Sequence, residues 1–237
     1  MGYAYTGMAN TPDAIYLNCA GLAQLNSTAL SFNYVRPFGM KELAHFSFNT
    51  AIPTSWGHFA AGVSSFGNEL YQEQTTVFGF SESISEKFFY GINFHYMKLQ
   101  IKGYGSDYCY GIDVGFLVKL NPRLNWGFFT TNINRASIGK SDDLLPQSFS
   151  TGINIVPLER INLNVDLYKE LPFPLELRAG IEYKLLDKIA VRGGFSTEPA
   201  QFCGGFGFFF RKIQCDYAVN THMDLGLTHQ FSIQLNF

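Results

Sequence analysis

The sequence predicts an all-β protein, a transmembrane antiparallel β-barrel of about 14 strands with an N-terminal hatch segment in its lumen. Three observations predict the barrel. Only 15% of the residues are charged while 16% are aromatic, which is a poor basis for a water-facing surface. No stretch approaches the roughly 18 consecutive apolar residues that a membrane-spanning helix needs. Apolar and polar residues alternate instead, as they do in strands.

The alternation is plainest at the end of the chain. Between Leu225 and Phe237 the odd positions are mostly large and apolar, and the even positions are polar or glycine. Residues 88–96 and 161–168 repeat this pattern. Successive side chains of a strand point to opposite faces, so each segment predicts a strand with one apolar and one polar face. The polar faces are rich in Gly, Ser, Thr and Asn, whereas the exposed face of a soluble β-sandwich is densely charged.

Segments of this kind, counted between turn signals, cover the chain after residue 25 without requiring a helix. The predicted strands are residues 28–36, 41–51, 56–66, 72–83, 87–102, 108–120, 126–138, 148–157, 161–170, 175–186, 188–196, 201–211, 213–220 and 225–237. Each has about the 9 to 11 residues that a tilted strand needs to cross a bilayer, or slightly more. Their even number is typical of bacterial outer-membrane barrels.

The connections between these segments fall into two classes. Every second one is a tight turn, as at residues 85–87, 121–123 and 211–212. The others are longer and richer in Gly, Pro and Asp, and the longest candidate is residues 139–147. Outer-membrane barrels have short periplasmic turns and longer extracellular loops. We therefore expect both chain ends on the periplasmic side.

Charge and composition exclude several functions. The chain has 17 Lys and Arg against 19 Asp and Glu, a net charge of −2, so a nucleic-acid partner is not expected. The cysteines match no zinc or redox spacing, and we interpret them as small buried residues, with a disulfide as the alternative. The histidines are scattered over separate segments. We therefore expect no cofactor, no metal site and no catalytic site.

Polar and charged side chains occupy the predicted inward face. They are Asn33, His45, Asn49, His95, Asp113, Asp166, Glu176, Arg178, Glu182, Arg192 and Asp216. Mixed charges in a lumen pair with one another or with a hatch, and we favour this interpretation over a role in channel selectivity. Inward glycines such as Gly91 and Gly115 leave space, which chain or water must occupy because a barrel of this width is not filled by its own side chains.

The first residues follow a different pattern. They run from Met1 through a turn at Pro12-Asp13 to the motif Asn18-Cys19-Ala20-Gly21-Leu22. Residues 1–23 resemble, without a gap, the N-terminal segment of the PorV and PorQ group of outer-membrane proteins, relatives of the FadL fatty-acid transporters. That group has a Met-Gly-Gly-Ala-Phe-like start and an Asn-Pro-Ala-Gly-Leu motif. This chain departs from it at Tyr3, where the group has Gly, and at Cys19, where it has Pro.

The resemblance implies a hatch of residues 1–25 inside a barrel of residues 26–237. The hatch motif residues are then Asn18, Ala20, Gly21 and Leu22, at the entry to the first strand. Inward polar residues of the first two strands are the expected hydrogen-bond partners of the hatch, namely Ser31, Asn33, His45, Ser47 and Asn49. The terminal Phe237 is similar to the C-terminal aromatic residue by which the assembly machinery recognises such barrels.

Three functions remain open. The resemblance favours a non-enzymatic barrel that acts through protein partners, like the PorV and PorQ accessory proteins of type IX secretion. The alternative is a FadL-like passive channel for hydrophobic small molecules, but a longest loop of residues 139–147 is too short to roof a pocket of a few hundred Å³. The third is a structural subunit of an envelope complex.

The predicted location is the outer membrane of a Gram-negative bacterium. The expected partners are the outer-membrane lipid bilayer, the barrel-assembly machinery and other envelope or secretion proteins. Export requires a signal peptide, and no charged n-region with an apolar core stands in the sequence, so we expect that signal upstream of Met1.

Overall fold

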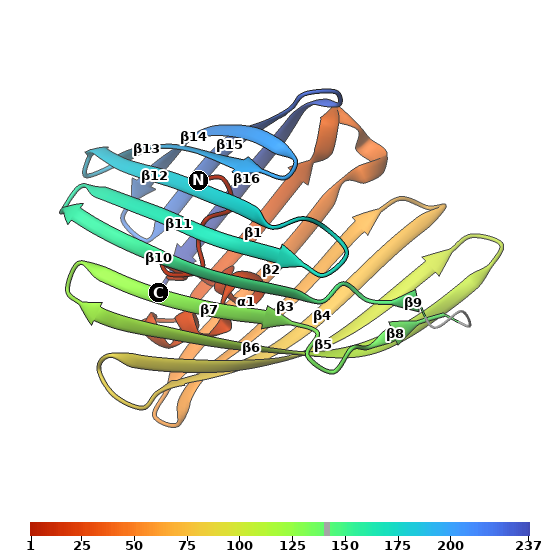
Figure 1. Ribbon diagram of the computed structural model, residues 1–237, viewed down its shortest axis with the longest axis horizontal. Helices are drawn as coiled ribbons and strands as arrows, with labels where there is room; N and C mark the ends of the chain where they lie inside the picture. The colour runs from red at the N-terminus through yellow and green to blue at the C-terminus, as the bar shows by residue number, and fades with distance from the viewer. Residues whose placement is uncertain (140–142) are drawn as a thin grey trace.

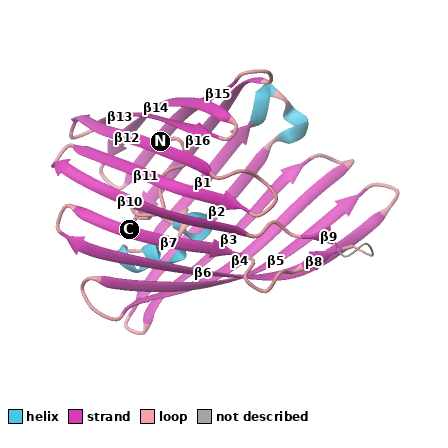
Figure 2. Ribbon diagram, viewed as in Figure 1, coloured by secondary structure: helices cyan, strands magenta, loops and turns pink. Residues whose placement is uncertain are grey.

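The computed structural model describes residues 1–139 and 143–237, and in it antiparallel strands form one closed barrel (Figures 1 and 2). The barrel strands are β1 (Ala29–Arg36), β2 (His45–Thr54), β3 (Gly57–Gly67), β4 (Tyr71–Ser83), β5 (Phe88–Ile101), β6 (Gly105–Asn121), β7 (Leu124–Thr131), β10 (Ser148–Leu158), β11 (Ile161–Glu170), β12 (Glu176–Leu186), β13 (Ile189–Thr197), β14 (Ala200–Phe210), β15 (Ile213–His222) and β16 (Gly226–Asn236). The predicted fold class is confirmed.

The remaining elements are short. They are the helix α1 (Ala14–Leu17), the 3-10 turns η1 (Cys19–Gln24), η2 (Pro37–Gly39) and η3 (Lys41–Leu43), and a separate two-stranded sheet of β8 (Ser137–Ile138) and β9 (Asp143–Leu144). None of the helices in the described part of the chain is long and apolar enough to cross a membrane.

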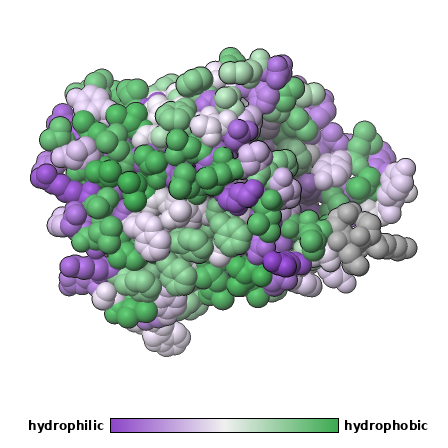
Figure 3. Space-filling model, viewed as in Figure 1, coloured by the Kyte–Doolittle hydropathy of each residue, from purple (hydrophilic) through white to green (hydrophobic). Residues whose placement is uncertain are grey.

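Strand β11 shows how the sequence builds the wall. Val165 faces outward and is 39% exposed, whereas its neighbour Asp166 faces inward and is 1% exposed. The register pairs Val165 with Ala179 and Asp166 with Arg178 of β12. Paired residues of the two strands therefore point to the same face of the wall. Hydrophobic side chains gather across the middle of the face shown in Figure 3, and hydrophilic ones lie mainly toward its two ends. This distribution suits an outer surface that faces hydrocarbon.

The connections alternate between two rims of the barrel. The tight-turn rim, on the left of Figure 1, carries turns such as residues 122–123, 159–160 and 187–188. The long-loop rim carries the connection of residues 132–147 between β7 and β10. The loop predicted at 139–147 includes residues 140–142, which lie outside the described residues. The whole connection starts earlier than predicted because β7 is shorter than predicted.

The strand predicted at 126–138 is wrong beyond Thr131. Asn132 has a φ of 53°, in the left-handed region that an extended strand does not use. Beyond this point the Asn134 side chain supplies a hydrogen bond to β6 in place of a paired strand. Its Nδ2 donates to the Tyr110 carbonyl oxygen at 2.9 Å. Side-chain amide chemistry therefore ends β7, where the hydrophobic pattern alone suggested that it continues.

The strand predicted at 41–51 is also shifted. Lys41–Leu43 form η3, and β2 begins at His45. Phe38 and Gly39 in η2 have φ values of 54° and 70°, so the chain turns sharply before the strand can start. The hydrophobic pattern required no helix after residue 25, and the structure adds these two short 3-10 turns there.

The barrel closes where β1 pairs with β16, with Asn33 opposite Ser232. Phe237 follows β16, and its backbone N–H donates a hydrogen bond of 2.9 Å to the Thr28 carbonyl oxygen. The Phe237 side chain is 61% exposed. Its role as an assembly signal stays a prediction.

The assignment of faces in β16 can be tested at two neighbouring residues. Ile233 pairs with Phe32 on the outer face, and Gln234 pairs with Ser31 on the inner face. We expect Ile233→Arg to lower the free energy of unfolding by about 2 to 4 kcal/mol, because it places a charge in hydrocarbon. Gln234→Arg should cost clearly less, because its charge faces the polar lumen. Reversible urea unfolding in lipid vesicles measures both, and equal losses would contradict the assignment.

Candidate functional site

The N-terminal segment, residues 1–25, lies inside the ring of strands, where Figure 1 shows it in red. Its apolar side chains Ile15, Cys19 and Leu22 are fully buried. They pack against inward residues of the wall, including Val77 of β4 and Leu117 of β6. The segment therefore forms an apolar core with one side of the lumen.

Inward glycines of the wall make room for this segment. A Cβ atom at Gly91 would lie 2.7 Å from the Ala20 backbone nitrogen, and one at Gly194 would lie 2.5 Å from the Gly2 nitrogen. A side chain at either position would collide with backbone. Gly127 and Gly180 likewise face the backbone of Thr6 and Met1, and Gly115 faces the side-chain oxygen of Asn18. The glycines that leave space in the lumen are thus the positions where the segment touches the wall.

Asp13 is the main anchor of the segment on the β1–β2 side. Its Oδ1 accepts hydrogen bonds from Ser31 Oγ at 2.6 Å, Asn33 Nδ2 at 2.8 Å and Asn49 Nδ2 at 2.7 Å. All three donors come from the inner face of β1 and β2. Hydrogen bonds to a charged acceptor are roughly twice as strong as neutral ones, so this carboxylate ties the segment firmly to the wall.

A second anchor lies across the lumen on β11. Asp166 Oδ2 accepts hydrogen bonds of 2.8 Å from the backbone N–H groups of both Tyr5 and Thr6. The Thr6 hydroxyl also lies 2.5 Å from the Ser150 hydroxyl of β10. Backbone groups of the segment that would otherwise be buried without partners are satisfied in this way.

Within the motif, Asn18 forms hydrogen bonds to other residues of the segment and to β6. Its Nδ2 donates to the Thr6 and Phe116 carbonyl oxygens at 2.8 and 3.0 Å, and its Oδ1 accepts from the Ala20 N–H at 3.2 Å. Gly21 lies directly against Ala9, where a Cβ atom would clash. The motif therefore folds the segment into a compact unit.

The cysteines are all free thiols. Burial and the nearby Asp113 carboxylate raise the pKa of the Cys19 thiol, so it stays protonated. Cys203 accepts a hydrogen bond of 2.8 Å from the Gly2 N–H. Both cysteines thus serve the packing of the segment.

Three cavities line up along the N-terminal segment. The loop-side cavity, about 570 Å³, opens at the long-loop rim. The central cavity, about 260 Å³, shares Tyr3, Tyr168 and Arg178 with it. The turn-side cavity, about 340 Å³, shares Tyr5 and Leu17 with the central one. The segment therefore divides the lumen into adjacent compartments.

Arg178 stands between the loop-side and central cavities. Its guanidinium carbon lies 3.7 Å from the centroid of the Tyr168 ring and 5.8 Å from that of Tyr3. Its Nη2 donates to Glu176 Oε2 at 2.7 Å. Tyr3 is held in turn by Asn220 Nδ2, which donates to its hydroxyl at 2.9 Å. We call Arg178, Tyr168 and Tyr3 the Arg178 stack.

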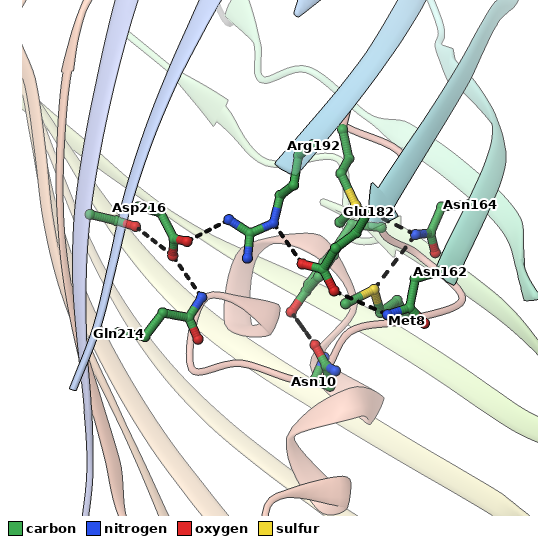
Figure 4. Close-up of polar contacts among 11 residues, drawn as sticks. Met8, Asn10, Asn162, Asn164, Glu182, Arg192, Gln214 and Asp216 are labelled. Atoms are coloured by element: carbon green, nitrogen blue, oxygen red, sulfur yellow. Dashed lines mark hydrogen bonds and ion pairs between the residues drawn. The ribbon is translucent and has the colours of Figure 1, made fainter. Parts of the chain in front are cut away.

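The turn-side cavity is walled by an ion-pair network (Figure 4). Arg192 Nε donates to Glu182 at 2.6 Å, and its Nη1 donates to Asp216. Gln214 also donates to Asp216 at 2.7 Å, and Asn162 to Glu182 at 3.0 Å. This end of the lumen is therefore polar and held in place by paired charges.

The eleven polar residues predicted to face the lumen all lie on the inner face of the barrel wall. Most belong to the anchors, the Arg178 stack or the ion-pair network. His95 and Asp113 form a separate buried pair, with 3.2 Å between His95 Nδ1 and Asp113 Oδ2. His45 stands apart near the long-loop rim. The functional roles of these residues stay predictions.

Asp13 was predicted only as part of a turn and not as an anchor. A signal was present, because Asp13 is the only charged side chain in residues 1–25. A lone charge in an apolar segment that enters a lumen requires partners. The expected partners Ser31, Asn33 and Asn49 do bind the segment, but through this carboxylate.

Within the described residues, no three His, Cys, Asp or Glu side chains are grouped so as to hold a metal ion. The lumen thus offers hydrogen bonds, aromatic faces and paired charges. Such an arrangement can bind or pass a solute.

No protein-family model and no curated protein matches the chain. Its fold, however, matches solved outer-membrane channels. The CymD monoaromatic hydrocarbon channel has a TM-score of 0.66 and 13% identity, covering 100% of this chain and 97% of that chain. The toluene transporter TbuX of Ralstonia pickettii has 0.67 and 14%, covering 100% and 98%. A FadL homologue of Pseudomonas aeruginosa has 0.68 and 12%, covering 99% and 96%.

At such low identity the likeness shows the fold alone, the closed barrel that these solved channels share. The prediction of an accessory role like that of PorV and PorQ is wrong, because the matching structures are channels for hydrophobic molecules. The expectation that the loops are too short to roof a pocket of a few hundred Å³ was also wrong. A cavity of about 570 Å³ does form, roofed in part by Phe173, Pro174 and Pro199 from two short loops.

The anchor at Asp13 predicts a measurable loss of stability. Asp13→Ala leaves the donors of Ser31, Asn33 and Asn49 without their shared acceptor, so we expect the free energy of unfolding to fall by about 2 to 3 kcal/mol. Asp13→Asn keeps one acceptor oxygen and should lose less.

Urea unfolding in lipid vesicles measures this loss, and hydrogen exchange reports whether residues 1–25 loosen. Asp187→Ala is the control, because that side chain is 95% exposed at a tight turn. If Asp13→Ala behaved like Asp187→Ala, Asp13 would not anchor the segment.

Proposed function

We propose that this protein is a non-enzymatic, passive outer-membrane channel for small hydrophobic molecules. The observation that carries the proposal is the series of three cavities along the N-terminal segment, from one rim of the barrel to the other. The fold supports it, because the matching structures are those of a monoaromatic hydrocarbon channel and of toluene transporters.

The loop-side cavity is the proposed entry. Its volume of about 570 Å³ lies in the range of small-molecule sites, roughly 300 to 1,000 Å³. Tyr3, Tyr168 and Phe173 supply aromatic surface, and Pro174 and Pro199 add apolar surface. A hydrophobic solute that leaves water for this cavity gains the free energy of burying its apolar area.

The N-terminal segment is the proposed barrier to free flow. Tyr5 borders both the central and the turn-side cavities, and its hydroxyl donates to Thr11 Oγ1 at 2.9 Å. Burial raises the pKa of Tyr5, so this donor is retained even in alkaline solution. Beyond it the paired charges of Arg192 and Asp216 disfavour an apolar solute. Passage to the tight-turn rim therefore requires the segment to shift.

The proposed setting follows from the fold. The apolar outer wall supports a location in the lipid bilayer of the outer membrane, and the barrel-assembly machinery is its proposed partner during insertion. The long-loop rim then faces the exterior, and the tight-turn rim faces the periplasm.

The proposal is tested by uptake of the dye N-phenyl-1-naphthylamine into vesicles with lipopolysaccharide in the outer leaflet, which slows its unaided entry. We expect the reconstituted protein to raise the initial uptake rate several-fold over empty vesicles. Gln201→Trp fills the loop-side cavity, which Gln201 lines, and should return the rate toward that of empty vesicles.

The matched control is Phe202→Trp, the same substitution at the next residue, which faces outward and is 64% exposed. It should leave uptake unchanged. Uptake equal to that of empty vesicles with the unmodified protein would overturn the proposed channel. Equal uptake by the two tryptophan variants would show that the loop-side cavity is not the entry.

A further inference from the structure

The outer wall of the barrel changes in character along its longest strands. β5 has 14 residues and β6 has 17, more than the roughly 9 to 11 that a tilted strand needs to cross a bilayer. Their hairpin reaches beyond the other strands at the long-loop rim, on the right of Figure 1. Along β5 the outward side chains pass from Ile92 and Phe94 through Tyr96 to Lys98. In the proposed membrane setting, this end of the wall extends past the hydrocarbon and into the lipid head groups.

Tyrosine rings and uncharged polar groups cover this end of the wall. The ring centroids of Tyr96 and Tyr110 lie 5.4 Å apart, and those of Tyr108 and Tyr110 lie 6.2 Å apart. Tyr108 is 59% exposed, so much of its ring is open to a ligand. Gln74 and Gln100 share this outer face through the register of β4, β5 and β6. Aromatic faces offer apolar contact to a sugar ring, and side-chain amides form hydrogen bonds with hydroxyl groups.

One positive charge stands among these neutral groups. Of the outward residues of β2–β6, strands that the structure describes in full, only Glu82 and Lys98 are charged. Glu82 lies at the tight-turn end, where it accepts a hydrogen bond of 2.6 Å from the Tyr90 hydroxyl. The cross-strand neighbours of Lys98 are Gln74 and Tyr108, which are uncharged. The Lys98 ammonium is therefore available to an anionic group outside the barrel.

A groove of about 380 Å³ lies on the same outer wall, and we call it the outer groove. Phe46 and Phe48 of β2 border it, and the smaller Val63 of β3 leaves space beside them. Gln74 also lines the outer groove and is the cross-strand neighbour of Lys98. An apolar groove beside a cation matches the chemistry of a lipid that has a hydrocarbon chain and an anionic head group.

We propose that this face binds one phosphate-bearing glycolipid of the outer leaflet. An acyl chain lies in the outer groove over Val63, the phosphate binds Lys98, and the sugar rings rest on Tyr108 and Tyr110. Charge complementarity carries the proposal, together with the continuity of this face with the apolar wall, which lipid surrounds. The inference rests on the proposed orientation in the outer membrane. It goes beyond the channel function and does not require it.

Three lipids test the inference on the unmodified chain. They are lipid A, which is a phosphorylated and acylated disaccharide, the same glycolipid without its phosphates, and phosphatidylglycerol, which has a phosphate but no sugar. Native mass spectrometry in nonionic detergent measures the binding of each over a lipid titration. We expect one lipid A per protein, bound about tenfold more tightly than either of the other two, because only lipid A offers both an anion and sugar rings.

Two variants separate the head-group contact from the groove. Lys98→Gln removes the cation and should lower the affinity for lipid A to that for the phosphate-free glycolipid. Its control is Lys212→Gln, at an exposed position in a tight turn. Val63→Trp fills the outer groove and should weaken the binding of both glycolipids about tenfold. Its control is Val191→Trp on β13, because both valines face outward with exposures of 50% and 47%. Neither control should change an affinity.

Binding of lipid A that is no tighter than that of the other two lipids would overturn the inference, and this comparison needs no variant. The inference would also fail if Lys98→Gln bound lipid A as Lys212→Gln does, or Val63→Trp as Val191→Trp does. Heat-modifiable mobility on gels checks that each variant is a folded barrel. Dye uptake is measured separately, so the lipid site and the proposed channel can fail independently of each other.

Discussion

The width of the barrel is the constraint on which the rest of the structure depends. A closed ring of this many strands is too wide to be filled by its own side chains. The chain fills part of the space with residues 1–25, and every buried polar group of that segment needs a partner. Asp13, Asn18 and Asp166 provide or receive these hydrogen bonds, and inward glycines let the backbones approach.

The same constraint produces the cavities. The segment packs tightly against β4, β5 and β6 through η1, while the β11–β14 side of the lumen stays open. Aromatic surface around Tyr168 lies at the long-loop rim, and paired charges around Arg192 lie toward the tight-turn rim. Under the proposed channel function, a solute meets the aromatic surface of the loop-side cavity first and the paired charges of the turn-side cavity afterwards.

Much of the fold was predictable because alternation with period two fixes the face of each residue once a strand is identified. Val165 and Asp166 illustrate this on β11. The end of β7 was not predictable, because Asn132 and Asn134 act through backbone conformation and side-chain hydrogen bonds that the hydrophobic pattern does not contain. The cavities depend on contacts between residues far apart in sequence, such as Tyr3 and Asn220, so loop length misled the functional prediction.

The N-terminal segment divides a lumen that the wall alone leaves open. Ion conductance in planar bilayers, compared between the full chain and a chain lacking residues 1–20, tests it most directly. The polar inner face can be hydrated once the segment is gone, so the barrel should still form. The account predicts a clear rise in conductance on deletion. Unchanged conductance from a deletion variant that is still heat-modifiable on gels, and therefore folded, would contradict it.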